Sequence, residues 1–423
     1  MPLLLAAAFV FHTHACAPPL QKVAARCGTV ATPDGIDLNV IVVKAQKKRA
    51  GATPMFHIEG GPGIAGTNPA LFYAGPGSMY RADRDVVLLD QRGTGGSNAL
   101  HCPALEKRSA LLEMYPPDEV ASCLHDLQAD LTKYSTENAA LDIDRVRQAL
   151  GYKRIDIWAV SYGTRLAQVY MRRFPDRVRN VVLVGTPSLD NRTPLFHAAA
   201  GQRVLDLIFY KCQLDADCSA KYPALRSEWE KVVEPDSPFA EAFRSMLGTA
   251  AAQRRVPFLI HAAANGDRKP LLDALPKDSS AFALGLYLTI ACSEGSARIN
   301  PSDIPRYTAG TFLGDYRVKE EMSACAQWPK YEVPADFFAP VKSNARVLMI
   351  SGEMDHAVPF EMSAAVCAAM SNCQMLTIPD MGHGPFDLDR WTHGECFDEI
   401  AARFLEGSLD TSCVKEMRPP AFQ

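Results

Sequence analysis

The sequence of 423 residues lacks long runs of charge of one sign, low-complexity tracts and internal repeats. Its 44 basic and 48 acidic side chains give a formal net charge of −4. A nucleic-acid partner would require a basic patch or stripe, which this distribution does not provide. Motifs for a metal ion or an organic cofactor are also missing, so no cofactor is predicted. The hydrophobic fraction of 48% is ordinary for a globular protein.

Apolar runs long enough to cross a membrane are missing too. The stretch from Leu3 to Val10 is too short to span a bilayer, so no integral membrane span is predicted. With the small residues around Cys16, it resembles the apolar centre and cleavage region of a signal peptide, although a basic n-region is lacking. Residues 1–17 are therefore predicted as a possible signal peptide, with a cytosolic N-terminal tail as the alternative.

The twelve cysteines include no C-x-x-C pair, which argues against zinc ribbons and thioredoxin-like redox motifs. An even number of cysteines, several of them close in sequence, favours disulfides formed in an oxidising compartment. The protein is therefore predicted to be secreted or periplasmic. The connectivity cannot be deduced from sequence alone. The close neighbours are Cys102 and Cys123, Cys212 and Cys218, Cys367 and Cys373, and Cys396 and Cys413.

Short apolar runs recur along the chain, and each ends in a glycine-rich or polar loop. Such runs suit strands that are buried on both faces of a parallel sheet. Helical patterns at 141–150 and 164–174 separate some of them, and the turn at 33–35 predicts a hairpin. This alternation predicts an α/β fold with a mostly parallel sheet flanked by helices. The expected strands are 55–58, 86–89, 155–160, 181–184, 347–350 and 375–378.

The alternation lapses in the middle of the chain, where the sequence is largely helix-like and rich in proline. We therefore predict a sheet core in two parts, 18–187 and 341–407, interrupted by a mainly helical cap at 188–340 and followed by a tail at 408–423. Ligands of open α/β sheets bind at the carboxyl ends of the strands. A cap inserted there would roof the site.

The stretch "AVSYG" lies at the junction between a predicted strand and a predicted helix. A nucleophile elbow has this form, with a serine on a strained turn and small residues two before and two after it. Here the small residues are Ala159 and Gly163, around Ser161. The usual first glycine is alanine, which weakens the pattern. The alternative is a serine in an ordinary tight turn.

A nucleophilic serine needs a base and a group that orients the base, and in this fold the acid and then the histidine follow the serine in chain order. Asp355 follows the strand at 347–350, and His383 follows the strand at 375–378. The prediction is Ser161 as nucleophile, His383 as general base and Asp355 as its orienting carboxylate. Asp355 could instead cap a helix, and Glu353 and Asp380 compete for its role.

Acyl transfer also requires donors for the oxyanion that develops on the substrate. The backbone N–H of Tyr162, next to the serine, is one candidate. The loop "EGGPG" supplies the other, and Gly61 is the candidate because Pro62 has no N–H. The alternative is a turn that uses glycine for its positive φ. A phosphate loop is discounted because its lysine and Ser/Thr are missing.

The motifs "EGGPG", "DQRGTGGS", "AVSYG", "GEMD" and "MGHG", in this order, resemble the proline iminopeptidase family of α/β-hydrolases. The closer similarity is to its secreted tripeptidyl-aminopeptidase-like branch, whose cap carries segments like "TIACSEG" and "CAQWP". The resemblance covers about residues 27 to 407. Two departures are Ala159 at the elbow and Glu59, where the family often has histidine. Glu59 puts in doubt the detailed shape beside the oxyanion hole.

The resemblance implies a serine peptidase that cuts peptides or amino-acid derivatives near a free N-terminus. Such an enzyme needs a carboxylate for the substrate's ammonium group. Glu294 is the candidate, held over Ser161 by a disulfide between Cys292 and Cys325, with a solvated surface glutamate as the alternative. Asp90 and Arg92 are expected to pin loops beneath the site.

Two other functions stay open at this point. A carboxylesterase or amidase acting on small acyl substrates would use the same machinery, because cap side chains decide specificity. A non-catalytic binding protein on the same fold is disfavoured by the complete set of serine, aspartate and histidine. The predicted partner is thus a peptide or small acyl substrate, and the oligomeric state is left unpredicted.

Overall fold

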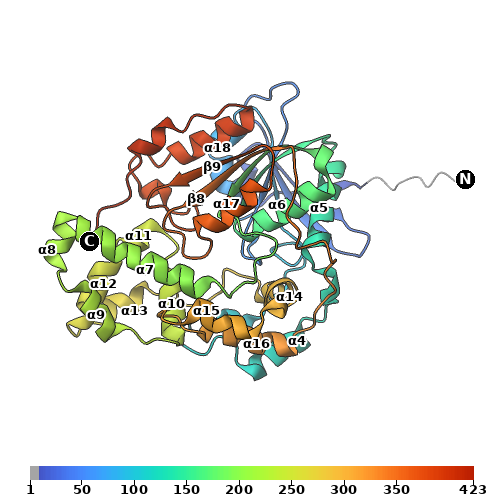
Figure 1. The fold of residues 1–423 in the computed structure, drawn as a ribbon. Helices are drawn as coiled ribbons and strands as arrows, with labels where there is room; N and C mark the ends of the chain where they lie inside the picture. The colour runs from blue at the N-terminus through green and yellow to red at the C-terminus, as the bar shows by residue number, and fades with distance from the viewer. Residues whose placement is uncertain (1–8) are drawn as a thin grey trace, which may run out of the picture.

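A single nine-stranded sheet organises the molecule, seen in a computed structural model that describes residues 9–423 (Figure 1). The spatial order of the strands is β1-β2-β3-β5-β4-β6-β7-β8-β9. The strands are β1 (Phe11–His14), β2 (Ala25–Ala31), β3 (Asp37–Val43), β4 (Met55–Ile58), β5 (Val86–Leu89), β6 (Ile155–Val160), β7 (Val178–Val184), β8 (Arg346–Gly352) and β9 (Cys373–Ile378).

The strand pairing confirms the predicted fold class. The strands β1, β2, β3 and β5 pair antiparallel, and from β5 through β4 to β9 all neighbours are parallel. The predicted hairpin joins β2 and β3, with Gly35 at a φ of 85°. The strands β4, β5 and β6 are buried along their whole length, as their continuous apolar sequences require.

Helices cover both faces of the sheet and bury two apolar clusters against it. Helices α5, α6 and α17 pack on one face, and α2 and α18 pack on the other. The side chain of Ser135 caps α5 by accepting a hydrogen bond from the N–H of Asn138. The helices outside the segment between β7 and β8 are α1 (Pro18–Gln21), α2 (Ala70–Ala74), α3 (Pro103–Glu106), α4 (Pro117–Asp126), α5 (Thr136–Ala149), α6 (Tyr162–Arg173), α17 (Phe360–Ala368) and α18 (Cys396–Glu406).

The chain between β7 and β8, hereafter the helical region, lies beside the sheet as a separate group of helices (Figure 1). It has its own apolar cluster, which includes Trp229, Phe243 and Phe312. The segment predicted as a cap falls within it. Its helices are α7 (His197–Leu214), α8 (Ala216–Lys221), α9 (Leu225–Val232), α10 (Pro238–Met246), α11 (Ala250–Gln253), α12 (Val256–Ala264), α13 (Lys269–Ala274), α14 (Leu284–Ile290), a π-helical turn η4 (Ala291–Gly295), α15 (Ile304–Thr308) and α16 (Tyr316–Gln327).

The C-terminal segment ends against the helical region (Figure 1). The hydroxyl of Tyr222 donates to the carbonyl of Gln423 at 2.8 Å, and the guanidinium of Arg254 lies over the ring of Phe422. The predicted tail at 408–423 therefore packs on the helices.

The N-terminal segment forms an edge strand of the sheet. Residues 1–8 of the predicted signal peptide lie outside the described residues. The described part forms β1, which pairs antiparallel with β2, and Cys16 is bonded to Cys27. Cleavage after residue 17 would remove this edge strand and leave Cys27 without its partner. The segment 11–16 thus packs on the sheet edge, and the predicted boundary at residue 17 stays a prediction.

The twelve cysteines form six disulfides, which confirms the prediction that they are paired. Among residues 9–423, no helix is both long and apolar enough to cross a membrane. The pairs are Cys16–Cys27, Cys102–Cys123, Cys212–Cys218, Cys292–Cys325, Cys367–Cys373 and Cys396–Cys413.

Candidate active site

Ser161 lies on a strained turn between the end of β6 and the start of α6. Its φ of 54° and ψ of −126° lie outside the regions that L-residues ordinarily adopt. A Cβ on Gly163 would approach the carbonyl oxygen of Ile58 to 2.3 Å, so only glycine fits there. The predicted elbow is therefore formed, with the alanine at 159 fully buried in β6.

The loops after β6, β8 and β9 bring Ser161, Asp355 and His383 together. His383 Nε2 is 2.8 Å from Ser161 Oγ, and His383 Nδ1 is 2.8 Å from Asp355 Oδ2. An imidazole placed between a hydroxyl and a carboxylate can take the hydroxyl proton and be stabilised in its charged form. The three residues are thus in contact in the order that the sequence predicts.

Asp355 is fully buried, yet its surroundings favour the ionised form. Burial raises its pKa, but the charge and hydrogen bond of His383 and the N–H of Val358 outweigh burial and lower it overall. The competitors predicted from sequence lie elsewhere. Glu353 pairs with Lys211, and Asp380 pairs with Arg254. Of the three acidic residues, Asp355 is the one that contacts the imidazole.

Glycines allow these loops to approach one another closely. A Cβ on Gly185, which follows β7, would lie 3.3 Å from both Asp355 Oδ2 and His383 Cε1. A Cβ on Gly382 would lie 2.2 Å from the carbonyl oxygen of Gly248, which also accepts the N–H of His383 at 3.0 Å. The histidine loop is thus held partly by the helical region.

The loop after β4 packs directly on the serine. A Cβ on Gly60 would approach Ser161 Cβ to 2.9 Å. The N–H of Gly60 donates to Glu59 Oε1, whereas the N–H groups of Gly61 and Tyr162 donate to no acceptor among residues 9–423. Gly61 and Tyr162 line the same cavity as Ser161, so their N–H groups stay the predicted donors to an oxyanion.

Glu59 turns its carboxylate back onto the loop and onto a neighbouring histidine. Its Oε2 lies 3.0 Å from His57 Nε2, and its Oε1 accepts the N–H of Gly60. Burial raises the pKa of Glu59, but the hydrogen bond and charge of His57 outweigh it and lower the pKa overall. The departure from the family pattern thus fixes Gly60 and leaves Gly61 free to donate.

Two adjoining cavities meet at the histidine. The inner cavity, of about 300 Å³, is lined by Ser161, Tyr162 and Gly61. The outer cavity, of about 400 Å³, leads to the exposed residues Leu112 and Asp278. Volumes of this size suit small-molecule or short-peptide ligands. Both cavities share Arg244, Phe282, Tyr287, Arg317, His356 and His383.

Two family models match the chain, one in the sheet core and one toward the C-terminus. Residues 53–213 match the alpha/beta hydrolase fold model, and residues 310–413 match a model described as TAP-like protein. The first match spans the serine turn, and the second spans the aspartate and the histidine. The chain therefore has the α/β-hydrolase fold. These matches confirm the predicted resemblance to the tripeptidyl-aminopeptidase-like branch.

Curated relatives of this α/β-hydrolase include peptidases. A tripeptidyl aminopeptidase from Streptomyces lividans is 24% identical over 448 residues, covering 88% of this chain and 79% of the relative. The protein YuaR from Escherichia coli is 30% identical, but the match covers 39% of this chain and 37% of YuaR. The serine protease Hip1 from Mycobacterium tuberculosis is 28% identical over 42% of this chain and 40% of its own length. The chain thus spans less than half the length of two of these relatives.

Among solved structures, the chain is similar to a proline iminopeptidase from Mycobacterium smegmatis. Its sequence is 17% identical, the match covers 90% of this chain and 97% of that chain, and the TM-score is 0.49.

Glu294 lies in the π-helical turn η4 and lines the inner cavity of the hydrolase, with only 1% of its surface exposed. The alternative of a solvated surface glutamate is therefore wrong. Its oxygens accept hydrogen bonds from both the N–H and the hydroxyl of Thr136 and from the hydroxyl of Tyr331, and Arg165 Nη2 lies 3.4 Å away. The carboxylate is thus held in a fixed position by four donors.

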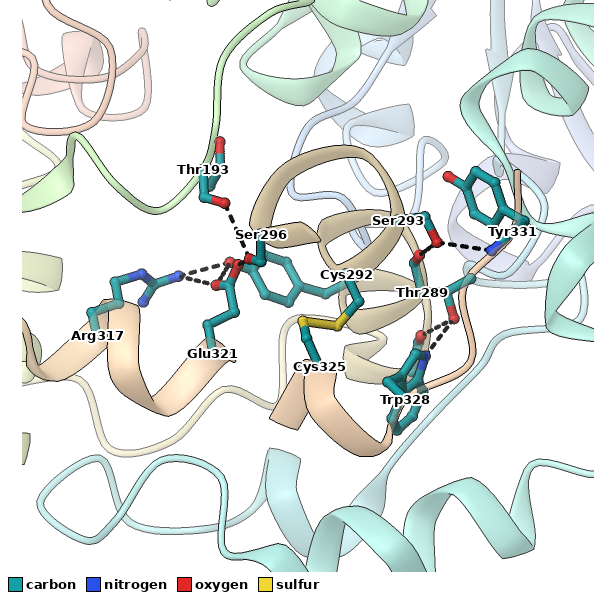
Figure 2. The surroundings of a disulfide bond; sticks show 12 residues. Thr193, Thr289, Cys292, Ser293, Ser296, Arg317, Glu321, Cys325, Trp328 and Tyr331 are labelled. Carbon is teal, nitrogen blue, oxygen red and sulfur yellow. Dashed lines mark hydrogen bonds and ion pairs between the residues drawn. A yellow bond between two sulfur atoms is a disulfide. The ribbon is translucent and has the colours of Figure 1, made fainter. Parts of the chain in front are cut away.

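The disulfide between Cys292 and Cys325 joins η4 to α16, as the resemblance implied (Figure 2). On one side of it, Arg317 and Glu321 come from α16, and on the other Tyr331 reaches back toward η4 (Figure 2). The indole N–H of Trp328 donates to the hydroxyl of Thr289. The disulfide thus fixes η4, which lines the cavity, against α16, the helix that carries Arg317.

Asp90 and Arg92 hold loops beneath the site, as predicted. Asp90 accepts hydrogen bonds from the N–H groups of Thr67 and Gly96. Arg92 makes a paired contact with Asp142 through Nε and Nη2. Neither residue lines the two cavities described above.

Several cavity residues escaped the sequence analysis. Arg165, Arg244 and Arg317 line the inner cavity, and they lie on three different helices. Long-range packing brings them together, so no local spacing in the sequence predicts that they share a cavity. His356 directly follows Asp355 in the sequence, and this adjacency was the one available signal.

Proposed function

We propose that this α/β-hydrolase is a serine aminopeptidase that cleaves a peptide bond near a free N-terminus through an acyl-enzyme on Ser161. The observation that carries the proposal is the hydrogen-bonded chain from Ser161 through His383 to Asp355, at the wall of a small cavity. The similarity to a tripeptidyl aminopeptidase and to a serine protease supports a peptide substrate.

In the proposed reaction, Ser161 Oγ attacks the carbonyl carbon while His383 Nε2 takes the hydroxyl proton. The negative charge that develops on the carbonyl oxygen is stabilised by the N–H groups of Gly61 and Tyr162. His383 then gives its proton to the leaving nitrogen, and the C–N bond breaks. A water molecule releases the acyl group in the same way, with His383 again as base, and the proton returns to Ser161. Asp355 keeps the imidazole in the required tautomer throughout.

Glu294 is the proposed contact for the substrate's ammonium group. Its place in the wall of the inner cavity and its burial support this role, because a carboxylate is worth more to a cation in a site with little water. Its bonds to Thr136, Tyr331 and Arg165 hold it in place before substrate binds. The helical region is the proposed cap that closes this end of the cavity.

An oxidising location is proposed as well. Six disulfides in one chain are typical of proteins that are exported from the cytosol to a compartment where thiols are not kept reduced. The proposed site of action is therefore extracellular or periplasmic.

Three substrates test the proposed activity: an aminoacyl p-nitroanilide, its N-acetylated form and a p-nitrophenyl ester. We expect kcat/KM for the free anilide to exceed that for the acetylated form by about 10- to 100-fold, the range for one hydrogen bond to a charged group. Rapid turnover of the ester with no cleavage of either anilide would instead support the carboxylesterase alternative.

Replacing Glu294 tests its role. Glu294→Gln is expected to bring the two anilides to within a few-fold of one another, since the charge is lost and the shape is kept. Glu234→Gln, at an exposed pair with Arg268, is the matched control and is expected to keep the preference. An unchanged preference in Glu294→Gln would remove Glu294 from the proposal.

A further inference from the structure

Two arginines lie on the boundary between the inner and outer cavities. Arg244 comes from α10 and Arg317 from α16, and both line both cavities together with His356 and His383. His356 and His383 are packed edge to face, with ring centroids 5.8 Å apart. Arg244 and Arg317 therefore line the same boundary between the two cavities as His383.

These side chains carry donors that no residue in the described chain uses. Arg244 is only 5% exposed, and its Nε and Nη2 donate to Glu241, but its Nη1 has no hydrogen-bond partner among residues 9–423. Arg317 Nε and His356 Nδ1 are also buried without a partner in that range. Buried donors without partners cost free energy unless a ligand or water satisfies them.

The residues that line both cavities include two guanidinium groups and no carboxylate. Both guanidinium groups contact one carboxylate, Glu241, whose pKa is lowered to about 2 because the charges of Arg244 and Arg317 outweigh its burial. Glu321 lies 3.9 Å from Arg317, but it does not line either cavity, and burial raises its pKa. Burial and then the charge of Arg244 lower the pKa of His356 to about 3.

The two cavities differ in what they can bind during the reaction. Ser161, Tyr162 and Gly61 line only the inner one, so the acyl group and its oxyanion belong there. His383 lines both, and it is the group that hands a proton to the leaving nitrogen. The leaving segment therefore extends into the outer cavity, past Arg244 and Arg317. If one residue leaves, its α-carboxylate is separated from the new amino group only by the α-carbon.

We propose that Arg244 and Arg317, assisted by His356, form a subsite for a carboxylate on the residue that follows the scissile bond. This inference rests on the proposed aminopeptidase function and narrows its substrates to short peptides that end soon after that bond, or to peptides with an acidic residue in that position. A guanidinium suits this task because its planar donors match a carboxylate.

The first test uses the unmodified protein and pairs of peptides with the best N-terminal residue found with aminoacyl anilides. A dipeptide is compared with its C-terminal amide, and an amidated dipeptide ending in aspartate is compared with one ending in asparagine. We expect kcat/KM to be at least about tenfold higher for the acid of one pair. A preference in the first pair identifies an α-carboxylate, and a preference in the second identifies an acidic side chain.

Equal values in both pairs, with the anilides still cleaved, would overturn the subsite and leave the proposed function standing. If no substrate with a free N-terminus is cleaved, the proposed function itself fails.

Variants assign the preference to the arginines. Arg244→Gln is expected to reduce the acid-to-amide ratio at least about tenfold while the amide is still cleaved. Arg226→Gln, at an exposed pair with Asp206 in the same helical region, is the control and is expected to keep the ratio. Because Arg244 also neutralises Glu241, the double variant Glu241→Gln/Arg244→Gln serves as the folded substitute if the single variant does not fold. A ratio that survives in the folded variant would contradict the assignment.

Discussion

The sheet and the helical region contribute to the candidate site in different ways. The sheet supplies Ser161, Asp355 and His383 from loops that directly follow strands, so neighbouring parallel strands bring them to one edge. The helical region supplies Arg244, Arg317 and its turn η4, held by ion pairs and a disulfide. We therefore expect reactivity to depend on the sheet and selectivity on the helices, and separate variants can test each.

The largest effect is expected from the serine. Ser161→Ala removes the attacking atom and should lower kcat by about 10⁶-fold, the scale found when a triad nucleophile is lost. Burst and steady-state kinetics with an aminoacyl anilide measure this. Ser227→Ala, on the exposed side of α9, is the control and should keep full activity. A loss below about tenfold in the Ser161 variant would place the reaction elsewhere.

The second effect also belongs to the sheet. Asp355→Asn keeps the shape but favours the wrong tautomer of His383, so kcat should fall by about 10⁴-fold. Asp380→Asn is the matched comparison, since this neighbour pairs with Arg254 and does not contact the imidazole. Equal losses in the two variants would show that the fold, and not the orienting carboxylate, is being measured.

Two disulfides of the helical region are expected to differ in their effects. Cys292–Cys325 closes 33 residues and Cys212–Cys218 closes 6. Replacing both cysteines by alanine should lower the free energy of unfolding by about 3–4 kcal/mol for the first pair and about 2 kcal/mol for the second, by loop-closure entropy. Only the first should also lower kcat/KM, because it fixes η4 against α16. Denaturant unfolding and steady-state kinetics on both variants measure the two quantities.

A smaller effect is expected from acid. The pKa of His356 lies at about 3 in the folded protein, against 6.5 for the unfolded chain. Between these values the unfolded state binds more protons, so stability rises with pH and is lost as pH falls from 6.5. By pH 4.5 this one group should cost about 2–3 kcal/mol. Glu241 adds to the loss below pH 4.5, where its unfolded form takes up a proton first.

Unfolding of the wild type and His356→Gln between pH 7 and 4.5 measures this contribution. The variant should lose less stability than the wild type over that interval. Parallel curves for the two proteins would show that His356 is not buried in its neutral form.

The two regions also differ in how far sequence could predict them. Ser161, Asp355 and His383 each follow a strand, and Ser161 and His383 also have small residues close by, because the fold imposes these local needs on the sequence. The strands at 55–58, 86–89 and 155–160 were predicted to the residue for the same reason. The sequence was therefore enough to predict the sheet, the pairing of the cysteines into disulfides and the contact among Ser161, Asp355 and His383.

The helical region offered no such signal. Arg244 and Arg317 are separated by seventy-three positions and meet only through Glu241. Long-range ion pairs leave no periodic pattern in a single sequence. The burial of Glu294 and the strand formed by residues 11–14 escaped for a related reason, because both depend on partners that are distant along the chain.

Labelling with a fluorophosphonate probe tests the reactivity of Ser161 most directly. In the folded protein with its disulfides intact, we expect one probe molecule per chain, on the peptide that contains Ser161, and none in the His383→Ala variant. Intact-mass and peptide-mass measurements read both results. A folded, disulfide-bonded protein that carries no label at Ser161 would contradict the proposed chemistry.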